Sequence, residues 1–390
     1  MTDRLYYTDS FLREFTARVT NVSDDGLLVR LDRTAFYPAS GGQPCDTGTL
    51  DGIVVVEAAD GDAGDVVHRL ESPFDAGASG REVAGIVDWK RRFDHMQQHT
   101  GQHLLSAVFE ELLKLKTVSF HMGADTSTID LEGKFDPSAL PGVELRANAL
   151  VRENRPVAVT FEDAAGVEGL RKPSQREGSL RIIAIQNLDR SACGGTHVRS
   201  TAEIGPILLR KTEKVRQTMR VEFLCGERAL RRARADYEAL YRVSQTVSGA
   251  IDEAPAMVAA LAESSRAKEK AVRKLELELA GYQGADLYRS TEPGADGVRR
   301  VARRDPRGNL EDLRAVAQSF TGQPKAVFLA AIEDPPSLLL AASEDAGIDA
   351  GKILKAALTE AGGRGGGTAR MAQGSVPDRA ALDRVLQRLA

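Results

Sequence analysis

Two short motifs carry four side chains whose types and spacing suit the binding of one metal ion. The first is HTGQH at residues 99–103, in an apolar segment, and the second is CGGTH at residues 193–197. An α-helix brings residues four apart onto one face, about 6 Å from each other, so His99 and His103 can face the same ion. Paired glycines permit a turn tight enough for Cys193 and His197 to converge on that ion. Because imidazole and thiolate are typical zinc ligands, we predict a Zn²⁺ site.

Neither motif is specific by itself, since HxxxH and CxxxH both arise by chance. The two pairs nevertheless use four of the nine residues that the 6 His and 3 Cys provide. Thr100 stands where a zinc peptidase of the HExxH type has its glutamate base, so such a peptidase is not expected. Three cysteines do not form a disulfide framework, which leaves Cys193 available as a thiolate.

The elements that must position these residues follow from hydrophobic periodicity. Five short β-rich runs in the first 88 residues, separated by turn signals, predict a small β-barrel. Its loop Ser40–Pro44 contains Gly41 and Gly42, which allow a partner to approach the backbone closely, and Gln43, whose amide both donates and accepts. A plain turn is the alternative interpretation.

Residues 89–116 have the apolar spacing of a helix, and this helix would carry the two histidines. Strands predicted at 118–121, 128–131, 156–161 and 181–185, with a helix at 141–153, indicate an α+β layer with the metal at one end. Ser119 and His121 are candidates for the wall of a substrate pocket. His68, His95 and His121 are expected to be surface or pocket residues and not ligands.

The C-terminal half is expected to begin with a helical hairpin at 227–280, because heptad-like apolar spacing is broken at residues 252–255. Strands at 326–331 and 337–342 then alternate with helices, which predicts a small α/β domain. The glycine block 362–367 could cradle a phosphate through its backbone N–H groups, or form a flexible loop. The predicted fold is therefore α+β and multidomain: a β-barrel domain (1–88), a zinc-containing domain (89–226), a helical hairpin linker (227–285) and an α/β domain with a Gly-rich loop (286–390).

Composition narrows the class of protein. The 390 residues are 42% hydrophobic and 28% charged with a net charge of −4, as in a soluble globular protein. No apolar run is long enough to cross a membrane and no signal peptide is evident, so a cytoplasmic location without membrane contact is expected. Residues 210–234 hold nine Lys and Arg against three Asp and Glu. This run could follow a phosphate backbone, or form the solvated face of a helix.

Four segments in the same order then carry a family resemblance: FYPASGGQPCDTG (36–48), MQQHTGQHLLSAV (96–108), ACGGTHV (192–198) and GGRGGGTARM (362–371). Together they resemble the editing half of alanyl-tRNA synthetase and its free-standing relatives, the AlaX proteins, in their long form. The Gly-Gly-Gln segment begins within the first 45 residues, which leaves no room before it for an aminoacylation domain. The resemblance therefore implies an editing protein that acts in trans.

The resemblance implies hydrolysis of the ester that joins serine, or glycine, to alanine tRNA, tRNA(Ala), at a site containing Zn²⁺. Thr100 is the candidate for contact with the serine hydroxyl, although it could instead bond its own helix backbone, and Gln43 is the second candidate catalytic residue. No general base is assigned. A non-catalytic RNA-binding protein that keeps zinc for folding is the competing hypothesis. The C-terminal domain is expected to bind RNA and to form a homodimer. Candidate substrate-binding residues are Gly41, Gly42, Ser119 and His121, and candidate tRNA-binding residues are Arg210, Lys211, Lys214, Arg216, Gly363, Arg364, Gly365 and Gly366.

Overall fold

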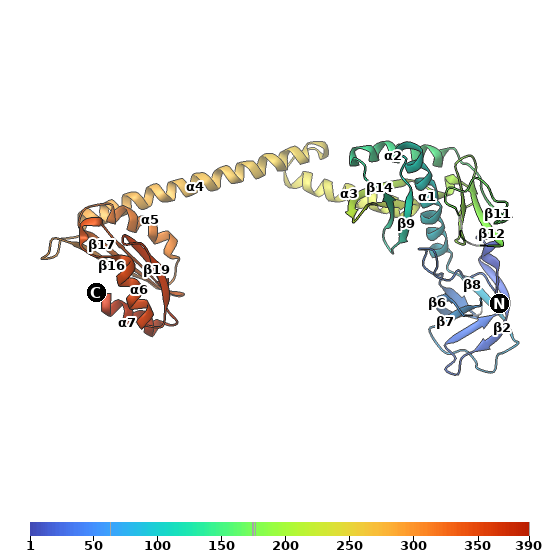
Figure 1. Cartoon of the computed structure of the whole chain (residues 1–390), viewed down its shortest axis with the longest axis horizontal. Coiled ribbons are helices and arrows are strands. Elements are labelled where there is room, and N and C mark those ends of the chain that lie inside the picture. The colour runs from blue at the N-terminus through green and yellow to red at the C-terminus, as the bar shows by residue number, and fades with distance from the viewer. Residues whose placement is uncertain (63, 174, 176, 390) are drawn as a thin grey trace. The chain divides into compact units, whose positions relative to one another are not determined.

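The computed structural model describes residues 1–62, 64–173, 175 and 177–389 (Figure 1). The chain divides into two compact units, Met1–Arg242 and Val243–Ala390. Both predicted metal motifs lie in the first unit, so the fold of that unit positions the site. Among the described residues, no helix combines the length and the apolar character that crossing a membrane requires.

The first unit begins with a closed barrel of six strands, which confirms the predicted β-barrel. Alternation in β2 (Glu14–Val22) and β8 (Glu82–Val87) sends Phe15, Ala17 and Val83 into the barrel core and their neighbours to solvent. A short parallel pair, β1 (Asp3–Arg4) and β4 (Arg33–Thr34), lies outside the barrel order. The barrel strands, in spatial order, are β2 (Glu14–Val22), β3 (Leu28–Leu31), β7 (Val66–Leu70), β6 (Ile53–Asp60), β5 (Gly48–Leu50) and β8 (Glu82–Val87).

Two histidines expected at a surface or pocket are buried, so that prediction was wrong for them. His68 lies in the barrel, where its Nε2 is 2.8 Å from Thr34 Oγ1 and its Nδ1 is 3.1 Å from the Val29 carbonyl oxygen. His95 is buried in the helix that also carries His99. A period-2 strand pattern does not distinguish a polar residue that finds partners inside a barrel from one that faces solvent.

The helix α1 (Trp89–Leu113) runs through the middle of the first unit, and every residue from His95 to Phe109 is buried. It starts at Asp88, whose carboxylate accepts from the backbone N–H of Arg91. One sheet of the unit has the order β14-β15-β10-β9, and a second has the order β11-β12-β13. The helix α2 (Leu140–Arg152) packs on α1. The strands of these sheets are β9 (Thr117–Met122), β10 (Ser127–Glu132), β11 (Val157–Asp163), β12 (Ser179–Ile185), β13 (Asp189–Ala192), β14 (Ile207–Val215) and β15 (Thr218–Cys225).

The first part of the basic segment 210–234 lies on strands β14 and β15, so the helix face expected there does not form. Arg210, Lys211 and Lys214 lie on β14, and Arg216 lies in the turn before β15 with φ of 54°. On β15, the buried residues Val221 and Phe223 alternate with Arg220 and Glu222, which is the period-2 signal for this hairpin.

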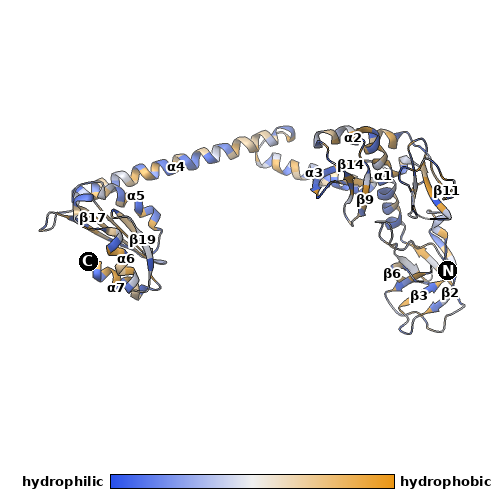
Figure 2. Ribbon diagram, viewed as in Figure 1, coloured by the Kyte–Doolittle hydropathy of each residue, from blue (hydrophilic) through white to orange (hydrophobic). Residues whose placement is uncertain are grey.

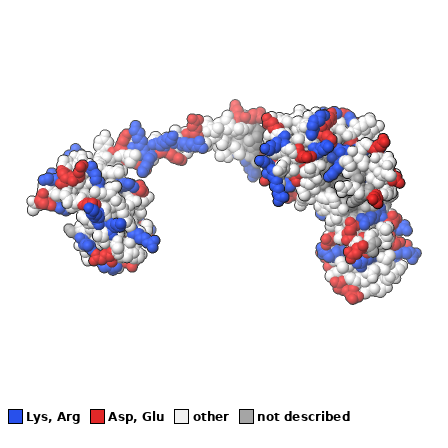
Figure 3. Space-filling model, in the orientation of Figure 1, with Lys and Arg blue, Asp and Glu red and all other residues white. Residues whose placement is uncertain are grey.

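The predicted helical hairpin is not confirmed. Two helices do form, α3 (Gly226–Thr246) and α4 (Ala254–Ser290), with the expected break between them. Their apolar positions are exposed instead of buried in a hairpin core, as Leu230, Leu261 and Leu275 show. Figure 2 shows hydrophobic and hydrophilic residues intermingled along α4, and Figure 3 shows a group of Lys and Arg side chains on it.

The second unit contains a five-stranded sheet with the order β16-β17-β18-β20-β19, which agrees with the predicted α/β character. The glycine block was predicted to form a loop and instead forms the edge strand β19, paired with β20. Close backbone approach explains its composition, because a Cβ at Gly365 would lie 2.5 Å from the Gln373 carbonyl oxygen. The elements are β16 (Arg299–Asp305), α5 (Leu310–Thr321), β17 (Ala326–Glu333), β18 (Pro336–Ala342), α6 (Ala350–Glu360), β19 (Arg364–Gly367), β20 (Met371–Ser375) and α7 (Arg379–Leu389).

Candidate metal centre

The buried helix α1 supplies the first two side chains of the site. His99 and His103 lie one turn apart, with ring centroids 5.4 Å from each other. Gly101 between them lets the helix approach β15 closely, since a Cβ at this position would lie 2.2 Å from Cys225 Sγ. A glycine costs about 1 kcal/mol in a helix interior relative to alanine. Close packing of helix on strand, which fixes where the two imidazoles lie, offsets that cost.

The CGGTH turn follows β13 and supplies the other two side chains. Gly195 passes directly against the ring of His99, because a Cβ there would lie 2.2 Å from His99 Cε1. The buried guanidinium of Arg181 on β12 holds the turn from the other side: its Nη1 donates to the carbonyl oxygens of Cys193 (2.7 Å) and Gly195 (2.9 Å). The chain therefore reaches the helical histidines only because residue 195 has no side chain.

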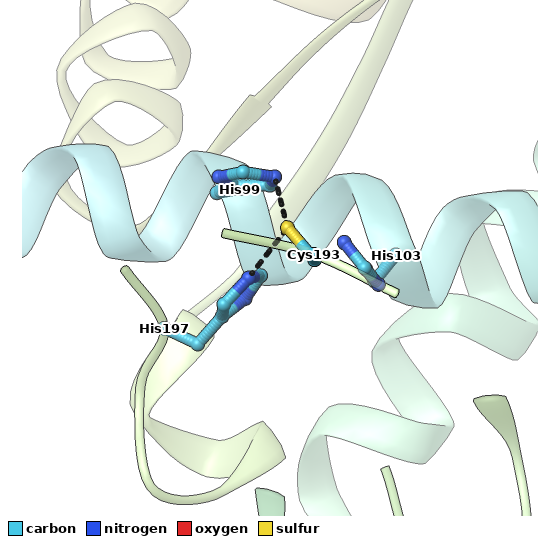
Figure 4. A group of neighbouring side chains, drawn as sticks. All are labelled: His99, His103, Cys193 and His197. Carbon is cyan, nitrogen blue, oxygen red and sulfur yellow. Dashed lines mark hydrogen bonds between the residues drawn. The ribbon is translucent and has the colours of Figure 1, made fainter. Parts of the chain in front are cut away.

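The four predicted ligands come together, and their ligand atoms all lie within 4.8 Å of one another. Cys193 Sγ is 3.4 Å from His99 Nε2 and 3.4 Å from His197 Nε2. Figure 4 shows His103 beside this group, on the same helix as His99. In tetrahedral zinc coordination, with Zn–S near 2.3 Å and Zn–N near 2.0 Å, sulfur and nitrogen ligands are about 3.5 Å apart. The donor set and its spacing fit a metal ion of this kind.

Hydrogen bonds behind the rings orient each imidazole in the same way. Every Nδ1 is engaged with an oxygen, which leaves every Nε2 for the centre of the cluster. This is the arrangement usual for metal-bound histidine, where the bond at the far nitrogen sets ring orientation and tautomer. The three pairs are His99 Nδ1 with Gln43 Oε1 (2.7 Å), His103 Nδ1 with Asp189 Oδ2 (2.9 Å) and His197 Nδ1 with Thr100 Oγ1 (3.1 Å).

The electrostatics favour a thiolate in the cluster. Burial disfavours the charged form of Cys193, but the neighbouring imidazoles, His99 foremost, outweigh burial and hold the pKa of the thiol well below its usual value. Burial likewise acts against the charged form of His103, but its hydrogen bond with Asp189 raises the pKa of His103 to about 9. Burial lowers the pKa of His197 to about 3, so that ring is neutral near pH 7.

A cavity of about 740 Å³ opens beside the cluster. His99, His103 and Cys193 line it, whereas His197 does not. Other parts of the wall come from the N-terminal segment, from the barrel end near Ser40, and from strands β9, β11, β12 and β13. The cavity is large enough for an organic group to lie against three of the four ligands.

The structure places both predicted catalytic residues behind the rings and not in the cavity wall, which corrects their expected contact with a substrate. Thr100 is fully buried, and its hydroxyl also accepts from the backbone N–H of Val198 (3.2 Å). Gln43 uses its amide nitrogen to donate to Thr196 Oγ1 (2.9 Å) while its oxygen serves His99. Both residues therefore hold imidazole rings of the four-residue cluster in place.

Two of the four predicted substrate-binding residues lie in the cavity wall, and the other two lie outside it. Gly41 and Ser119 line the cavity, and the Ser119 hydroxyl donates to Asp130 Oδ2 (2.6 Å). Gly42 is not part of the wall; its backbone approaches Phe120, whose carbonyl oxygen would lie 2.5 Å from a Cβ at position 42. The His121 side chain is 59% exposed beside Asp130 and also stands outside the wall.

The predicted tRNA-binding residues lie in both units. Arg210 is paired with Asp236 and Lys211 with Glu222, at 3.8 Å. Lys214 and Arg216 are exposed, and neither forms an ion pair within the described part of the chain. In the second unit, Gly363 lies against the Ser375 carbonyl oxygen, and Arg364, Gly365 and Gly366 belong to the edge strand β19.

Sequence reasoning missed Asp189 and Arg181. Asp189 accepts from His103 and from Arg171 Nε (2.6 Å), and its pKa is held at about 2, because these bonds outweigh the burial that would raise it. The only hint of this role in the sequence is that Asp189 lies four residues before the predicted ligand Cys193, and this hint is weak. Arg181 interrupts an apolar strand, and a charged residue facing a core is the only sign of its role in the sequence.

Comparisons with known proteins place this geometry in a family. Residues 180–221 match the threonyl and alanyl tRNA synthetase second additional domain, and residues 300–390 match the DHHA1 domain. The alanyl-tRNA editing protein AlaX-M of Methanosarcina acetivorans is 37% identical over 55% of this chain and 94% of its own length. The alanine–tRNA ligase of Pyrococcus abyssi is 31% identical over 97% of this chain, which spans only 42% of that enzyme.

The alanyl-tRNA editing protein AlaX-L of Pyrococcus horikoshii is 31% identical over 96% of this chain and 95% of its own length. The match thus includes the barrel, the four-residue cluster and the C-terminal sheet. The chain belongs to the AlaX family of alanyl-tRNA editing proteins.

Proposed function

We propose that the chain is a trans-editing hydrolase that cleaves the ester bond between a wrongly attached amino acid and tRNA(Ala). Serine is the first proposed amino acid and glycine the second. One observation carries the proposal: three imidazole Nε2 atoms and a thiolate converge at the wall of a cavity, with every Nδ1 engaged behind the rings. Family membership supplies the class of substrate.

His99, His103, Cys193 and His197 would hold zinc, and their chemistry fits that metal, since imidazole and thiolate donors at these separations suit tetrahedral coordination. When bound, zinc supplies a positive charge that can polarise an ester carbonyl or orient the aminoacyl group. Gln43, Asp189 and Thr100 keep the rings in place through their bonds to Nδ1. These positioning residues pre-organise the site before any substrate enters.

An editing site is needed in addition to the site that attaches alanine, because binding alone discriminates too weakly between similar amino acids. A pocket made for alanine cannot strongly reject glycine, which is smaller, or serine, which adds only a hydroxyl. A site that hydrogen-bonds the serine hydroxyl can reject alanine, because its polar groups would be left unpaired. Polar side chains of the cavity wall near the ligands, Gln102, Thr117 and Ser119, are in the place where such recognition is required.

Deacylation of Ser-tRNA(Ala), Gly-tRNA(Ala) and Ala-tRNA(Ala) tests the proposal, together with the zinc content of the same samples. We expect the zinc-loaded protein to release serine faster than alanine, and Cys193→Ala to lose both zinc and activity. Cys45→Ala is the matched control, because this half-buried cysteine lies outside the cluster. Inactivity of the zinc-loaded protein on all three substrates would favour the alternative, a non-catalytic zinc-containing RNA-binding protein.

We propose further that tRNA contacts come from both units. Lys214 and Arg216 are free of ion pairs within the described residues and therefore suit a phosphate backbone better than Arg210 and Lys211 do. We also propose RNA binding at the edge strand around residues 363–366 and a homodimer formed through the C-terminal domain. Salt-dependent tRNA binding and the mass of the particle in solution are the measurements that test them.

A further inference from the structure

The cavity beside the metal cluster reaches Phe161 on β11, a residue that the proposed reaction does not use. Side chains of a strand alternate between faces, so Phe161 lies on the same face as Val157 and Val159. The cross-strand partners of Val157 and Val159 are the buried Ile185 and Ile183. Phe161 thus continues a core-facing row beyond the core and into the cavity wall.

The Phe161 side chain is 52% exposed although it lies on this core-facing row. Within the described residues it has no aromatic neighbour, whereas Phe120, in the same wall, lies against His99 with 5.4 Å between ring centroids. A large flat apolar surface is therefore presented to an opening that three of the four candidate metal ligands also line. This arrangement suits a ligand that has a flat ring of its own.

The charges of the wall indicate that the ligand is also anionic. Four cations line the cavity against one carboxylate, Asp60, with which Arg4 is paired at 2.6 Å. Arg171 is paired with Asp189, outside the wall. Lys172 and Arg181 have no carboxylate partner in the described part of the chain.

Arg181 is the cross-strand partner of Phe161 and lies on the same face of the sheet. Its side chain is 7% exposed, and its Nη2 has no hydrogen-bond partner among the described residues. No carboxylate among the described residues pairs with this buried guanidinium, and an anion that approaches Nη2 would offset part of the cost of its burial. A flat apolar ring beside a cation that has no carboxylate partner matches the two parts of a nucleotide, its base and its phosphate.

We propose that Phe161 is a stacking platform for the unpaired base at the 3′ end of an RNA, whose esterified ribose then lies against the metal cluster. The phosphate that precedes this nucleotide faces the basic side of the wall at Arg181 and Lys172. The inference rests on the proposed function, because it names how that substrate is held. Stacking of one base on an aromatic ring is worth about 1–3 kcal/mol, or roughly 5- to 150-fold in Kd.

The experiment compares two short single-stranded RNAs of the same sequence, one ending in adenosine and one ending in an abasic nucleotide. Both carry a 5′ fluorophore, and Kd is measured by anisotropy with the zinc-loaded full chain. The variants are Phe161→Ala, Phe161→Trp and the control Leu145→Ala, which removes an exposed apolar side chain on α2 that does not line the cavity. Phe161 is half exposed, so its substitution should leave the fold intact.

We expect the wild-type chain and Leu145→Ala to prefer the adenosine-ended RNA by at least about fivefold. Phe161→Ala should lose this preference, and Phe161→Trp should retain it. A Phe161→Ala protein that keeps the full preference, or a wild-type chain that shows none, would overturn the inference.

Deacylation kinetics separate this inference from the proposed reaction. With Ser-tRNA(Ala), Phe161→Ala should raise KM and leave kcat unchanged, as expected for binding energy that is equal in the ground and transition states. Absence of deacylation, together with a base preference that depends on Phe161, would refute the reaction and leave the platform in place. Normal deacylation by Phe161→Ala with unchanged KM would refute the platform alone.

Discussion

Substitution of Gly195 by alanine tests most directly whether close backbone approach builds the metal centre. Neither Gly195 nor its neighbour Gly194 has a positive φ, so alanine can adopt both backbone conformations. A Cβ at position 195 would lie 2.2 Å from His99 Cε1, 2.4 Å from His99 Nδ1 and 3.1 Å from Gln43 Oε1. At position 194 the nearest atom is Tyr7 Oη at 3.5 Å, which is an ordinary contact. The two substitutions therefore differ only in the space available.

The magnitude follows from how far the His99 ring must move. Relief of a 2.2 Å contact requires a displacement of about 1 Å or more, whereas metal–ligand distances tolerate about 0.2 Å. Such a shift also breaks the 2.7 Å bond between His99 and Gln43. Loss of an orienting partner alone costs about 10- to 100-fold in metal affinity, so Gly195→Ala should weaken zinc binding by at least this factor. Overpacking should also lower the free energy of unfolding by about 1–3 kcal/mol.

The assay is competition for zinc against a chromophoric chelator, with urea unfolding of the metal-free protein measured in parallel. Gly194→Ala should bind zinc as the wild-type chain does, and its stability should be unchanged or slightly higher, because alanine restricts the unfolded chain. Deacylation of Ser-tRNA(Ala) should follow zinc affinity. Wild-type zinc affinity in Gly195→Ala would refute the reasoning that a missing side chain lets the turn reach His99.

Three further predictions concern buried polar groups. Asp189→Asn should weaken zinc binding about 10- to 100-fold, measured by the same competition, because the variant no longer offers His103 a carboxylate; wild-type affinity would contradict this. Burial lowers the pKa of His68 to about 4, so the His68 ring binds a proton less readily in the folded chain than in the unfolded chain. The free energy of unfolding should therefore fall as the pH drops from about 6.5 toward 4, by roughly 3 kcal/mol from this histidine. Urea unfolding of wild type and His68→Gln at pH 7.5 and pH 5 checks this, and equal losses in both proteins would exclude His68 as a source. Arg92→Met should lower the free energy of unfolding by about 3–5 kcal/mol, since it leaves the fully buried Asp46 carboxylate unpaired. The double variant with Asp46→Leu should recover part of that loss, and a single variant as stable as wild type would contradict the prediction.

Much of the fold could be predicted from local sequence. Period-2 runs with turn signals predicted the barrel, and the spacing of apolar residues predicted α1. Strands β14 and β15 are hard to predict because β14 has three consecutive apolar residues followed by a charged run, and alternation is clear only on β15. Glycine is a weak strand former, so the block 362–367 does not predict a strand, and only the pairing of residues 364–367 with β20 makes them one.

The helical hairpin illustrates a limit of the same kind. Heptad spacing in α3 and α4 predicts helices with an apolar stripe, and both helices form. Spacing within one segment does not determine what covers the stripe, and Leu261 and Leu275 are exposed in the described chain. Helix formation is thus a local property, whereas the partner of a helix face is not.

The sequence alone determined the candidate ligand set, because the spacing within each pair is a local property: one helical turn for His99 and His103, and one glycine turn for Cys193 and His197. Which residues surround the ligands depends instead on how distant segments pack together. Successive helix residues are about 100° apart, so Thr100 and Gln102 lie on opposite sides of the histidine face, and periodicity cannot tell which side is open. Packing against the CGGTH turn buries Thr100, and Gln102 lines the cavity. Gln43 and Asp189 reach the rings from distant segments, and such long-range contacts have no local signature because chain folding alone brings them together.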